Sequence, residues 1–432
     1  MHQRQAYRGG VLHFTGHPEQ GSEAPYEYWP DGALLICDGK VEWVGPWHAA
    51  AEQIPDATPI KEYPHHLLIP GFVDTHIHYP QTQMIAAYGE QLLDWLQRYT
   101  FPVEMQFADP DHCASVARWF LDELLRNGTT TALVFCTVHP GSVDALFQEA
   151  WERRMRLIAG KVMMDRNAPE PLLDTPETGY AESQALIERW HGVDRLAYAV
   201  TPRFAPTSSL EQLAMAGKLL KQYPGLYLHT HLSENKDELA WVHELYPDAE
   251  NYLAVYDQAG LLGSRSVFAH GIHLCDEEWQ CLAATDSVLA HCPSSNLFLG
   301  SGLFNLEQAR SAGVRVGMGT DVGAGTSFSM LRTLGDAYKV QQLQGESLNP
   351  FRALYMATLG GAKALSLDHL IGTFKPGYEA DFTVLDLEST PLMQQRLTYC
   401  NDLAERLFVL QTLGDDRCIE ATYVLGQCLF QK

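Results

Sequence analysis

The stretch PGFVDTHIHYPQ, residues 70–81, places two histidines one residue apart at the end of an apolar run. A β-strand has a period of two, so His76 and His78 project from the same face of the strand. The pair is weak evidence alone, because a chain of 432 residues with 18 histidines contains about one H-x-H by chance. A metal site at this pair therefore requires further ligands from elsewhere in the chain.

The sequence after residue 66 alternates short apolar runs with helical patterns. Strands that are apolar on both faces and separated by helices are typical of parallel strands in βαβ units. Eight such runs lie at 67–78, 129–137, 156–165, 195–204, 226–234, 266–272, 287–296 and 314–321. This series predicts an α/β fold built on a (β/α)8 TIM barrel, with a doubly wound open sheet as the alternative.

The two ends of the chain have a different pattern, in which short alternating strands are separated by turn residues and there is little helix. GALLICDGKVEWVGP, at 32–46, and ADFTVLDL, at 380–387, are examples. We expect residues 1–67 and 367–432 to form one small β-sandwich together, beside a barrel of residues 68–366.

The longest insertion runs from Tyr79 to about Pro110, directly after the first predicted barrel strand, and is rich in aromatic residues. A loop at the C-terminal face of a barrel can cover a bound ligand. Its aromatic side chains can equally pack on the barrel rim, and the sequence alone favours neither arrangement.

Composition narrows the class of protein. The net charge of −23 repels phosphate backbones and anionic membranes, so we expect neither nucleic acid nor a membrane as partner. No apolar run approaches the length of a bilayer span, and the N-terminus lacks the apolar core of a signal peptide. The nine cysteines are irregularly spaced, which favours a reducing cytoplasm over a disulfide framework.

Three later strands end in residues that could complete a site with the histidine pair. The fifth ends in LHTHLSEN with His229 and His231, the sixth in FAHG with His270, and the eighth in MGTDVGAG with Asp321. Active sites of barrels lie at the C-terminal ends of the strands. Histidine and aspartate suit Zn²⁺, and a catalytic zinc typically has three protein ligands and a water. Glu234 follows His231 closely, either as a proton carrier or as the first turn of a helix.

These motifs resemble those of a known superfamily. PGFVDTHIH, HTHLSE, AHG, HCPSSN and GTD follow one another in the order seen in the amidohydrolases, and the resemblance covers nearly the whole chain. It implies that residues 68–366 are a metal-dependent hydrolase barrel. THIHYPQ, TPRFAPTSS, HLSENKDE and GTDVGAGTSFSM together resemble the guanine deaminases of that superfamily, which implies hydrolytic deamination of guanine to xanthine and ammonia. A cytosine, adenosine-type or triazine hydrolase is the alternative, and a non-catalytic scaffold is a rival from another class.

The resemblance also implies roles for individual residues. The implied metal ligands are His76, His78, His231 and Asp321. The implied substrate contacts are Gln81, Arg203, Phe204, Glu234 and His270. Of these residues, Glu234 would shuttle protons, His270 would orient the attacking water, and Asp321 would also accept a proton. His229 remains a candidate for supporting a ligand.

The end of the fourth strand bears on the number of metal ions. Two-metal members of the superfamily carry a carbamylated lysine there, whereas this chain has Arg203. The resemblance therefore implies one Zn²⁺ per chain, with Fe²⁺ as the alternative, a small-molecule substrate and a homodimer. The loop after Asp321 reads GAG where the family pattern leads us to expect GGG, so Ala324 adds a methyl group near the predicted site.

Overall fold

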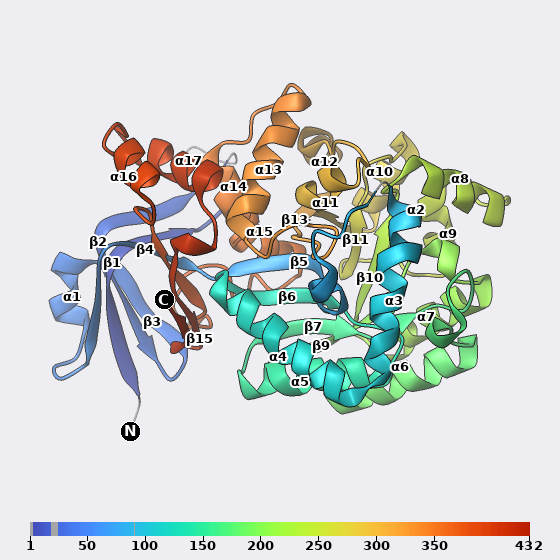
Figure 1. Cartoon of the computed structure of the whole chain (residues 1–432). Coiled ribbons are helices and arrows are strands. Elements are labelled where there is room, and N and C mark those ends of the chain that lie inside the picture. Colours follow the sequence, from blue (N-terminus) through green and yellow to red (C-terminus); the bar gives the residue numbers. More distant parts are fainter. Residues whose placement is uncertain (1–2, 19–24, 90) are drawn as a thin grey trace.

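The computed structural model describes residues 3–18, 25–89 and 91–432, which form two sheets (Figure 1). The middle of the chain forms a barrel of parallel strands surrounded by helices. The second sheet takes strands from both ends of the chain, which are blue and red in Figure 1. The predicted combination of a barrel with a separate unit built from both termini is confirmed.

The barrel strands coincide with the eight apolar runs. They are β5 (Phe72–His78), β6 (Thr129–Phe135), β7 (Arg156–Gly160), β9 (Leu196–Pro202), β10 (Tyr227–Leu232), β11 (Ser266–His270), β12 (Val288–His291) and β13 (Arg315–Met318). Neighbours in this order are paired, and the short β8 (Val162–Met163) pairs with β9. The backbone N–H of Asp321 donates to His76 O at 2.9 Å, and that of His78 donates to Val322 O at 2.8 Å. These bonds join the first strand to the chain after the last, so the barrel is nearly closed.

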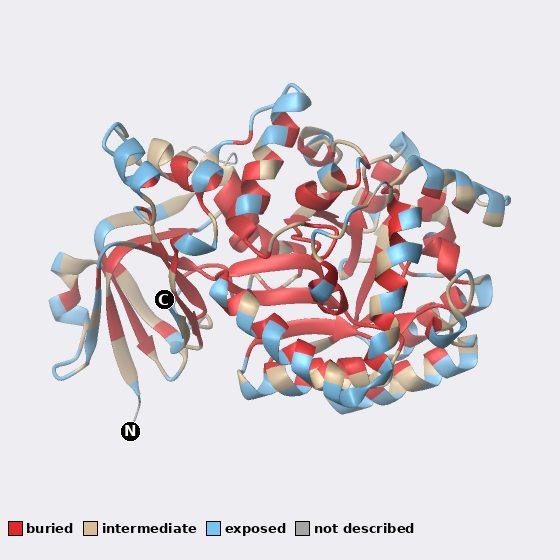
Figure 2. Cartoon of the chain, in the orientation of Figure 1, coloured by how far each residue is buried: buried red, intermediate tan, exposed pale blue. Residues whose placement is uncertain are grey.

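Burial explains why these segments form strands and helices as they do. Every residue of β5 and of β6 is buried, as expected for parallel strands covered on both faces (Figure 2). Helix α4 (Pro110–Arg126) starts at a proline and is capped by the Asp109 side chain. It buries an apolar stripe that includes Val116, Phe120 and Leu124, while its other side faces solvent.

Further helices cover the barrel or lie between its strands. They are α5 (Pro140–Glu152), α6 (Pro176–Trp190), α7 (Leu210–Gln222), α8 (Lys236–Leu245), α9 (Tyr252–Gln258), α10 (Asp276–Ala284), α11 (Pro293–Phe298), α12 (Leu306–Ala312), α13 (Met330–Leu343), α14 (Pro350–Met356) and α15 (Leu359–Ala364). Short turns of 3₁₀-helix lie at η4 (Glu170–Leu172) and η5 (Ala205–Thr207). Within the described ranges, no helix combines the length and the apolar character needed to cross a bilayer.

The insertion after β5 is mostly helical. It consists of η1 (Tyr79–Met84), α2 (Leu92–Trp95), the π-helical turn η2 (Leu96–Thr100), α3 (Phe101–Glu104) and η3 (Met105–Ala108). The segments α2, η2 and α3 follow one another directly, so residues 92–104 form one irregular helical stretch.

The second sheet has seven strands in the order β16-β15-β14-β4-β1-β2-β3. Its elements are β1 (Arg4–Phe14), β2 (Tyr26–Cys37), β3 (Lys40–Pro46), α1 (Trp47–Gln53), β4 (Ile60–Pro70), β14 (Phe382–Asp386), η6 (Asp416–Cys418), β15 (Ile419–Val424) and β16 (Gln427–Gln431). The antiparallel pairing of β14 with β4 joins the two ends of the chain. The rings of Phe382 and Tyr423 stack at 4.3 Å between centroids in its core.

The C-terminal region contains more helix than its sequence pattern indicates. Helices α16 (Pro391–Leu397) and α17 (Leu403–Leu413) are capped by the Thr390 and Asp402 side chains. The expectation of little helix there is wrong, because the cap residues and not the alternation of apolar residues mark these segments. The division of the chain at residues 67 and 367 stays a prediction; β4 continues to Pro70 before the first barrel strand begins.

A buried ionic cluster joins the barrel to the second sheet. Arg195 lies just before β9, and its guanidinium pairs with Glu379 at 2.6 Å and with Asp381. Arg156, the first residue of β7, pairs with the other oxygen of Glu379 at 2.5 Å. Both arginines are at the N-terminal ends of barrel strands, where side chains contribute to stability rather than catalysis.

We expect Arg195→Met to lower the free energy of unfolding by about 3–5 kcal/mol, because it leaves Asp381 as a buried carboxylate without its partner. The Arg195 side chain is only 4% exposed, so solvent cannot replace the lost contacts. Urea unfolding followed by tryptophan fluorescence measures the change. Arg189→Ala, which removes an exposed pair with Asp144, is the control and should cost about 1 kcal/mol or less. Equal midpoints for the two variants would contradict the prediction.

Candidate active site

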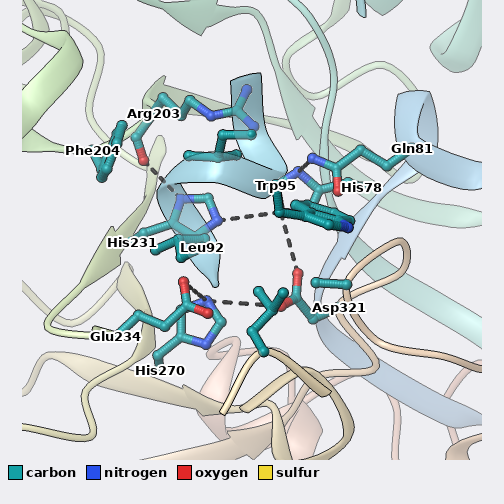
Figure 3. A pocket seen from close by; sticks show the side chains of 13 residues that line it. His78, Gln81, Leu92, Trp95, Arg203, Phe204, His231, Glu234, His270 and Asp321 are labelled. Carbon is teal, nitrogen blue, oxygen red and sulfur yellow. Dashed lines mark hydrogen bonds and ion pairs between the residues drawn. The ribbon is translucent and has the colours of Figure 1, made fainter. Parts of the chain in front are cut away.

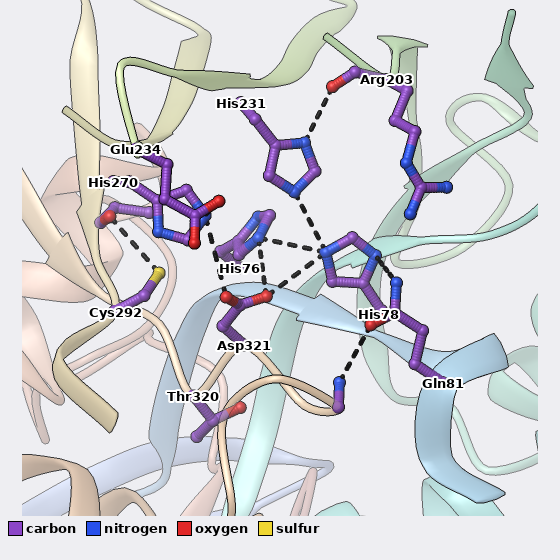
Figure 4. A network of polar contacts seen from close by, with 12 residues as sticks. His76, His78, Gln81, Arg203, His231, Glu234, His270, Cys292, Thr320 and Asp321 are labelled. Atoms are coloured by element: carbon purple, nitrogen blue, oxygen red, sulfur yellow. Dashed lines mark hydrogen bonds and ion pairs between the residues drawn. The ribbon is translucent and has the colours of Figure 1, made fainter. Parts of the chain in front are cut away.

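Side chains from four barrel strands converge at the C-terminal end of the barrel (Figure 4). His76 and His78 come from the end of β5, His231 from β10 and His270 from the end of β11. Asp321 follows β13, in the loop that closes the barrel onto β5. The local patterns on these strands therefore bring residues up to 245 positions apart, such as His76 and Asp321, into one site.

The separations within this cluster fit the ligands of a single metal ion. His78 Nε2 lies 3.2 Å from His76 Nε2 and 3.2 Å from His231 Nε2. Asp321 Oδ1 lies 3.0 Å from His76 Nε2 and 3.3 Å from His78 Nε2. Four ligands at the usual zinc distances in a tetrahedron are separated by roughly 3.3 Å. The four sequence-predicted ligands therefore have the spacing that a tetrahedral ion requires.

The protonation of these groups also suits a cation. Burial lowers the pKa of His78 to about 3 and that of His231 well below its ordinary value, so both imidazoles are neutral near pH 7. Burial would raise the pKa of Asp321, but His76 and His78 beside its carboxylate outweigh burial and hold that pKa well below its usual range. Neutral imidazoles offer lone pairs and the carboxylate offers negative charge, which are the requirements of a divalent metal.

A second set of contacts orients the ligand histidines. His231 Nδ1 donates to the carbonyl oxygen of Arg203 at 2.8 Å, which leaves its Nε2 free to bind a cation. His76 Nδ1 faces His229 Nε2 at 2.7 Å. His229 is fully buried behind His76 and lies outside the group of converging atoms.

We expect His229→Ala to weaken metal binding about 10–100-fold, because His76 loses the partner that holds its ring. Competition with a chromophoric chelator measures the affinity. His229→Gln is the matched variant, since its side chain still offers an acceptor to His76 Nδ1, and it should lose less. An unchanged affinity in His229→Ala would show that the contact does not support the ligand.

Asp74 is a site residue that the sequence analysis missed. It is fully buried in β5, and its carboxylate accepts hydrogen bonds from the backbone N–H groups of His76 and Thr320, at 3.2 and 3.1 Å. Burial raises the pKa of Asp74 to about 7, against the effect of these bonds. The residue ties the first strand to the segment that carries Asp321. A carboxylate inside a fully buried strand is the signal that could have identified it.

Glu234 and His270 lie together beside the cluster. His270 Nε2 is 3.3 Å from Glu234 Oε2 and 3.7 Å from Asp321 Oδ2. Burial and the nearby Asp321 raise the pKa of Glu234 to about 8, so this carboxyl carries a proton near neutral pH. Ser301 Oγ donates to Glu234 Oε1 at 3.2 Å, and Asn296 Oδ1 lies 2.9 Å from His270 Nδ1. Ser301 and Asn296 were also missed, because nothing in their local pattern indicates contact with these groups.

A pocket opens over the cluster (Figure 3). Its lining residues are His78, Gln81, Leu92, Trp95, Leu96, Arg203, Phe204, His231, Glu234, His270, Leu299, Asp321 and Ala324. Three of them, Leu92, Trp95 and Leu96, belong to the insertion after β5. The insertion therefore covers the site instead of packing only on the rim. An apolar wall with a few polar groups is typical of a small-molecule site.

The three residues predicted to contact substrate line this same pocket. Gln81 lies in η1, and Arg203 and Phe204 follow the end of β9. Ala324, the departure from the expected GGG pattern, is also in the lining. The sequence-predicted residues are thus all found at one site, with His229 directly behind it.

Comparison with known proteins agrees with this geometry. Residues 67–429 match the amidohydrolase family. The chain is 56% identical to a guanine deaminase of Escherichia coli (strain K12), over 100% of this chain and 99% of that protein. A solved structure of E. coli guanine deaminase has a TM-score of 0.97 and covers 99% of this chain and 100% of that one. A guanine deaminase from C. acetobutylicum, solved with guanine in its active site, is 30% identical with a TM-score of 0.89 over 99% of this chain and 100% of that one. The chain therefore belongs to the amidohydrolase family.

Proposed function

We propose that this protein hydrolyses guanine to xanthine and ammonia. The observation that carries the proposal is that Arg203 and the protonated Glu234 line one pocket directly above the cluster of ligand side chains. The full-length similarity to the E. coli guanine deaminase supports the same substrate. The resemblance to guanine deaminases in the sequence motifs is independent of the pocket geometry and agrees with it.

We propose one Zn²⁺ per chain, with Fe²⁺ as the alternative, held by His76, His78, His231 and Asp321. The ion supplies, when bound, a water molecule that loses a proton near neutral pH. Three neutral nitrogens and one carboxylate are the donor set that suits a catalytic zinc.

The protein side chains divide the remaining work of the reaction. Asp321 accepts the proton that the attacking water loses, and His270, held by Asn296, fixes the direction of attack. Glu234 donates its proton to ring nitrogen N3 while the water oxygen bonds to C2, the carbon that bears the amino group. Protons taken up during the addition then return to the amino nitrogen, the C2–N bond breaks, and ammonia leaves with xanthine as the product.

Arg203 provides the basis for choosing guanine. Its guanidinium offers only hydrogen-bond donors, which suit the oxygen at C6 of guanine. Adenine carries an amino group at that carbon, so a donor would face a donor in a buried site, which can discriminate by orders of magnitude. We propose that Gln81 contacts a polar edge of the base and that Phe204 lies against it in the apolar wall.

Ammonia release from guanine, adenine and cytosine by the purified protein tests this function. We expect turnover of guanine far above that of the other two bases. Release from cytosine or adenine but not from guanine would replace the proposal with another aminohydrolase. Metal analysis of the protein as isolated tests the scaffold alternative, which predicts neither zinc nor iron.

The cytoplasmic location and the homodimer remain predictions from sequence. Light scattering coupled to size-exclusion chromatography tests the homodimer, for which we expect about twice the chain mass of 48.3 kDa.

A further inference from the structure

A buried glutamate of the insertion contacts both polar side chains that are proposed to recognise the base. Glu104 ends α3 and is 1% exposed. Arg203 Nη1 donates to its two carboxylate oxygens, at 2.7 and 2.9 Å. Gln81 Nε2 donates to the Oε1 atom of the same carboxylate at 3.3 Å. No motif of the chain draws attention to Glu104, because it lies in an irregular helical stretch between predicted elements.

The contact with Arg203 restricts how its guanidinium can be used. Glu104 engages Nη1 alone, and among the described residues no side chain or carbonyl takes a hydrogen bond from Nη2 or Nε. Phe101, one turn earlier in the insertion, has its ring 5.5 Å from the guanidinium carbon. Arg203 is thus held on one side by the insertion while it lines the pocket on the other.

The contact with Gln81 selects the orientation of its amide. An ionised carboxylate accepts hydrogen bonds but cannot donate them, so the amide nitrogen and not the oxygen must face Glu104. The amide oxygen then accepts from the backbone N–H of Gly323 at 3.3 Å. Glu104 and Gly323 together determine which end of the amide lies toward each side of the pocket (Figure 4).

The charge of Glu104 has a further effect. The positive charge of Arg203 reaches the candidate metal ligands, since it contributes to lowering the pKa of His78, after the larger effect of burial. A guanidinium beside a bound cation would be repelled if it were unpaired. The carboxylate of Glu104 offsets that charge, so Arg203 can remain 3% exposed at the site.

We propose that Glu104 is a positioning residue for base specificity. It aims Arg203 and Gln81 so that the site distinguishes a purine with an oxygen at C6 from one without it. This inference rests on the proposed guanine activity and names the residue that sets its selectivity.

The test compares guanine with 2-aminopurine, which has the same amino group at C2 but no oxygen at C6. We expect Glu104→Ala to lower kcat/KM for guanine about a hundredfold, because Arg203 loses its support. The value for 2-aminopurine should change by less than a factor of about three, since that base offers Arg203 no oxygen. Where 2-aminopurine is turned over too slowly, its inhibition constant against guanine replaces kcat/KM.

Two further variants guard against a general effect on folding. Glu104→Asp keeps the carboxylate and should recover part of the preference for guanine. Glu278→Ala removes another buried glutamate, one that accepts from the backbone N–H groups of Leu253 and Cys275 outside the pocket. It should leave the ratio of the two purines as in the unmodified protein.

Equal losses on both purines in the Glu104 variants would mean a purely structural role and would overturn the inference, while the proposed function would stand. An unmodified protein that releases no ammonia from guanine would refute the proposed function, and the inference with it. A preference that falls in Glu104→Ala, recovers in Glu104→Asp and stays unchanged in Glu278→Ala supports the positioning role.

Discussion

Glu234→Gln is expected to keep its metal and to lose about 10²–10⁴-fold in kcat with guanine. Burial and Asp321 raise the pKa of Glu234 to about 8, so the unmodified residue carries the proton that ring nitrogen N3 needs. Glutamine has nearly the same shape and can still meet Ser301, but its amide does not release a proton to the base. The structure around the metal ligands should therefore be preserved while proton transfer is lost.

Steady-state kinetics together with metal analysis of the same preparation measures this effect. Glu278→Gln is the matched control, because that glutamate is also buried but caps α10 away from the pocket. It should keep kcat near that of the unmodified protein. A Glu234→Gln variant with full metal content and ordinary turnover would remove Glu234 from the mechanism.

Asp321→Ala is expected to reduce both the metal content and the activity, with kcat/KM falling at least about 10³-fold. This change removes the only carboxylate among the four proposed ligands and also the group that takes the proton of the attacking water. Three neutral histidines alone leave the ion without a compensating negative charge. Metal per chain after dialysis, and turnover with metal added back, separate the loss of binding from the loss of proton transfer.

Cys292→Ser provides the control for this prediction. Cys292 is close enough to His76 and Asp321 to form an alternative group of three possible ligands. Its thiol donates to the carbonyl of Ala290 at 3.4 Å, and serine can make the same bond. We expect this variant to keep its metal. Loss of metal in Cys292→Ser to the same extent as in Asp321→Ala would make the cysteine a ligand and require a different donor set.

Most of the barrel and its site could be predicted because both depend on local patterns. A strand that is covered on both faces needs a continuous apolar run, so β5 and β6 are recognisable without their neighbours. The C-terminal ends of such strands share one face of a barrel, so His76, His231 and Asp321 could be placed together before the structure was known. The helices α16 and α17 were missed for the opposite reason, since their caps are weaker signals than apolar alternation.

The sequence by itself determined the number and order of the barrel strands, the joining of both termini and the residues at the strand ends, because strand periodicity and burial leave direct traces in neighbouring residues. Only the tertiary structure decided that the insertion covers the pocket, that His229 supports His76, and that Glu104 pairs with Arg203, 99 positions away. Such contacts depend on how distant segments approach one another in space. A carboxylate in an irregular helix has no pattern that names its partner, and burial of the pair becomes evident only once the barrel has closed.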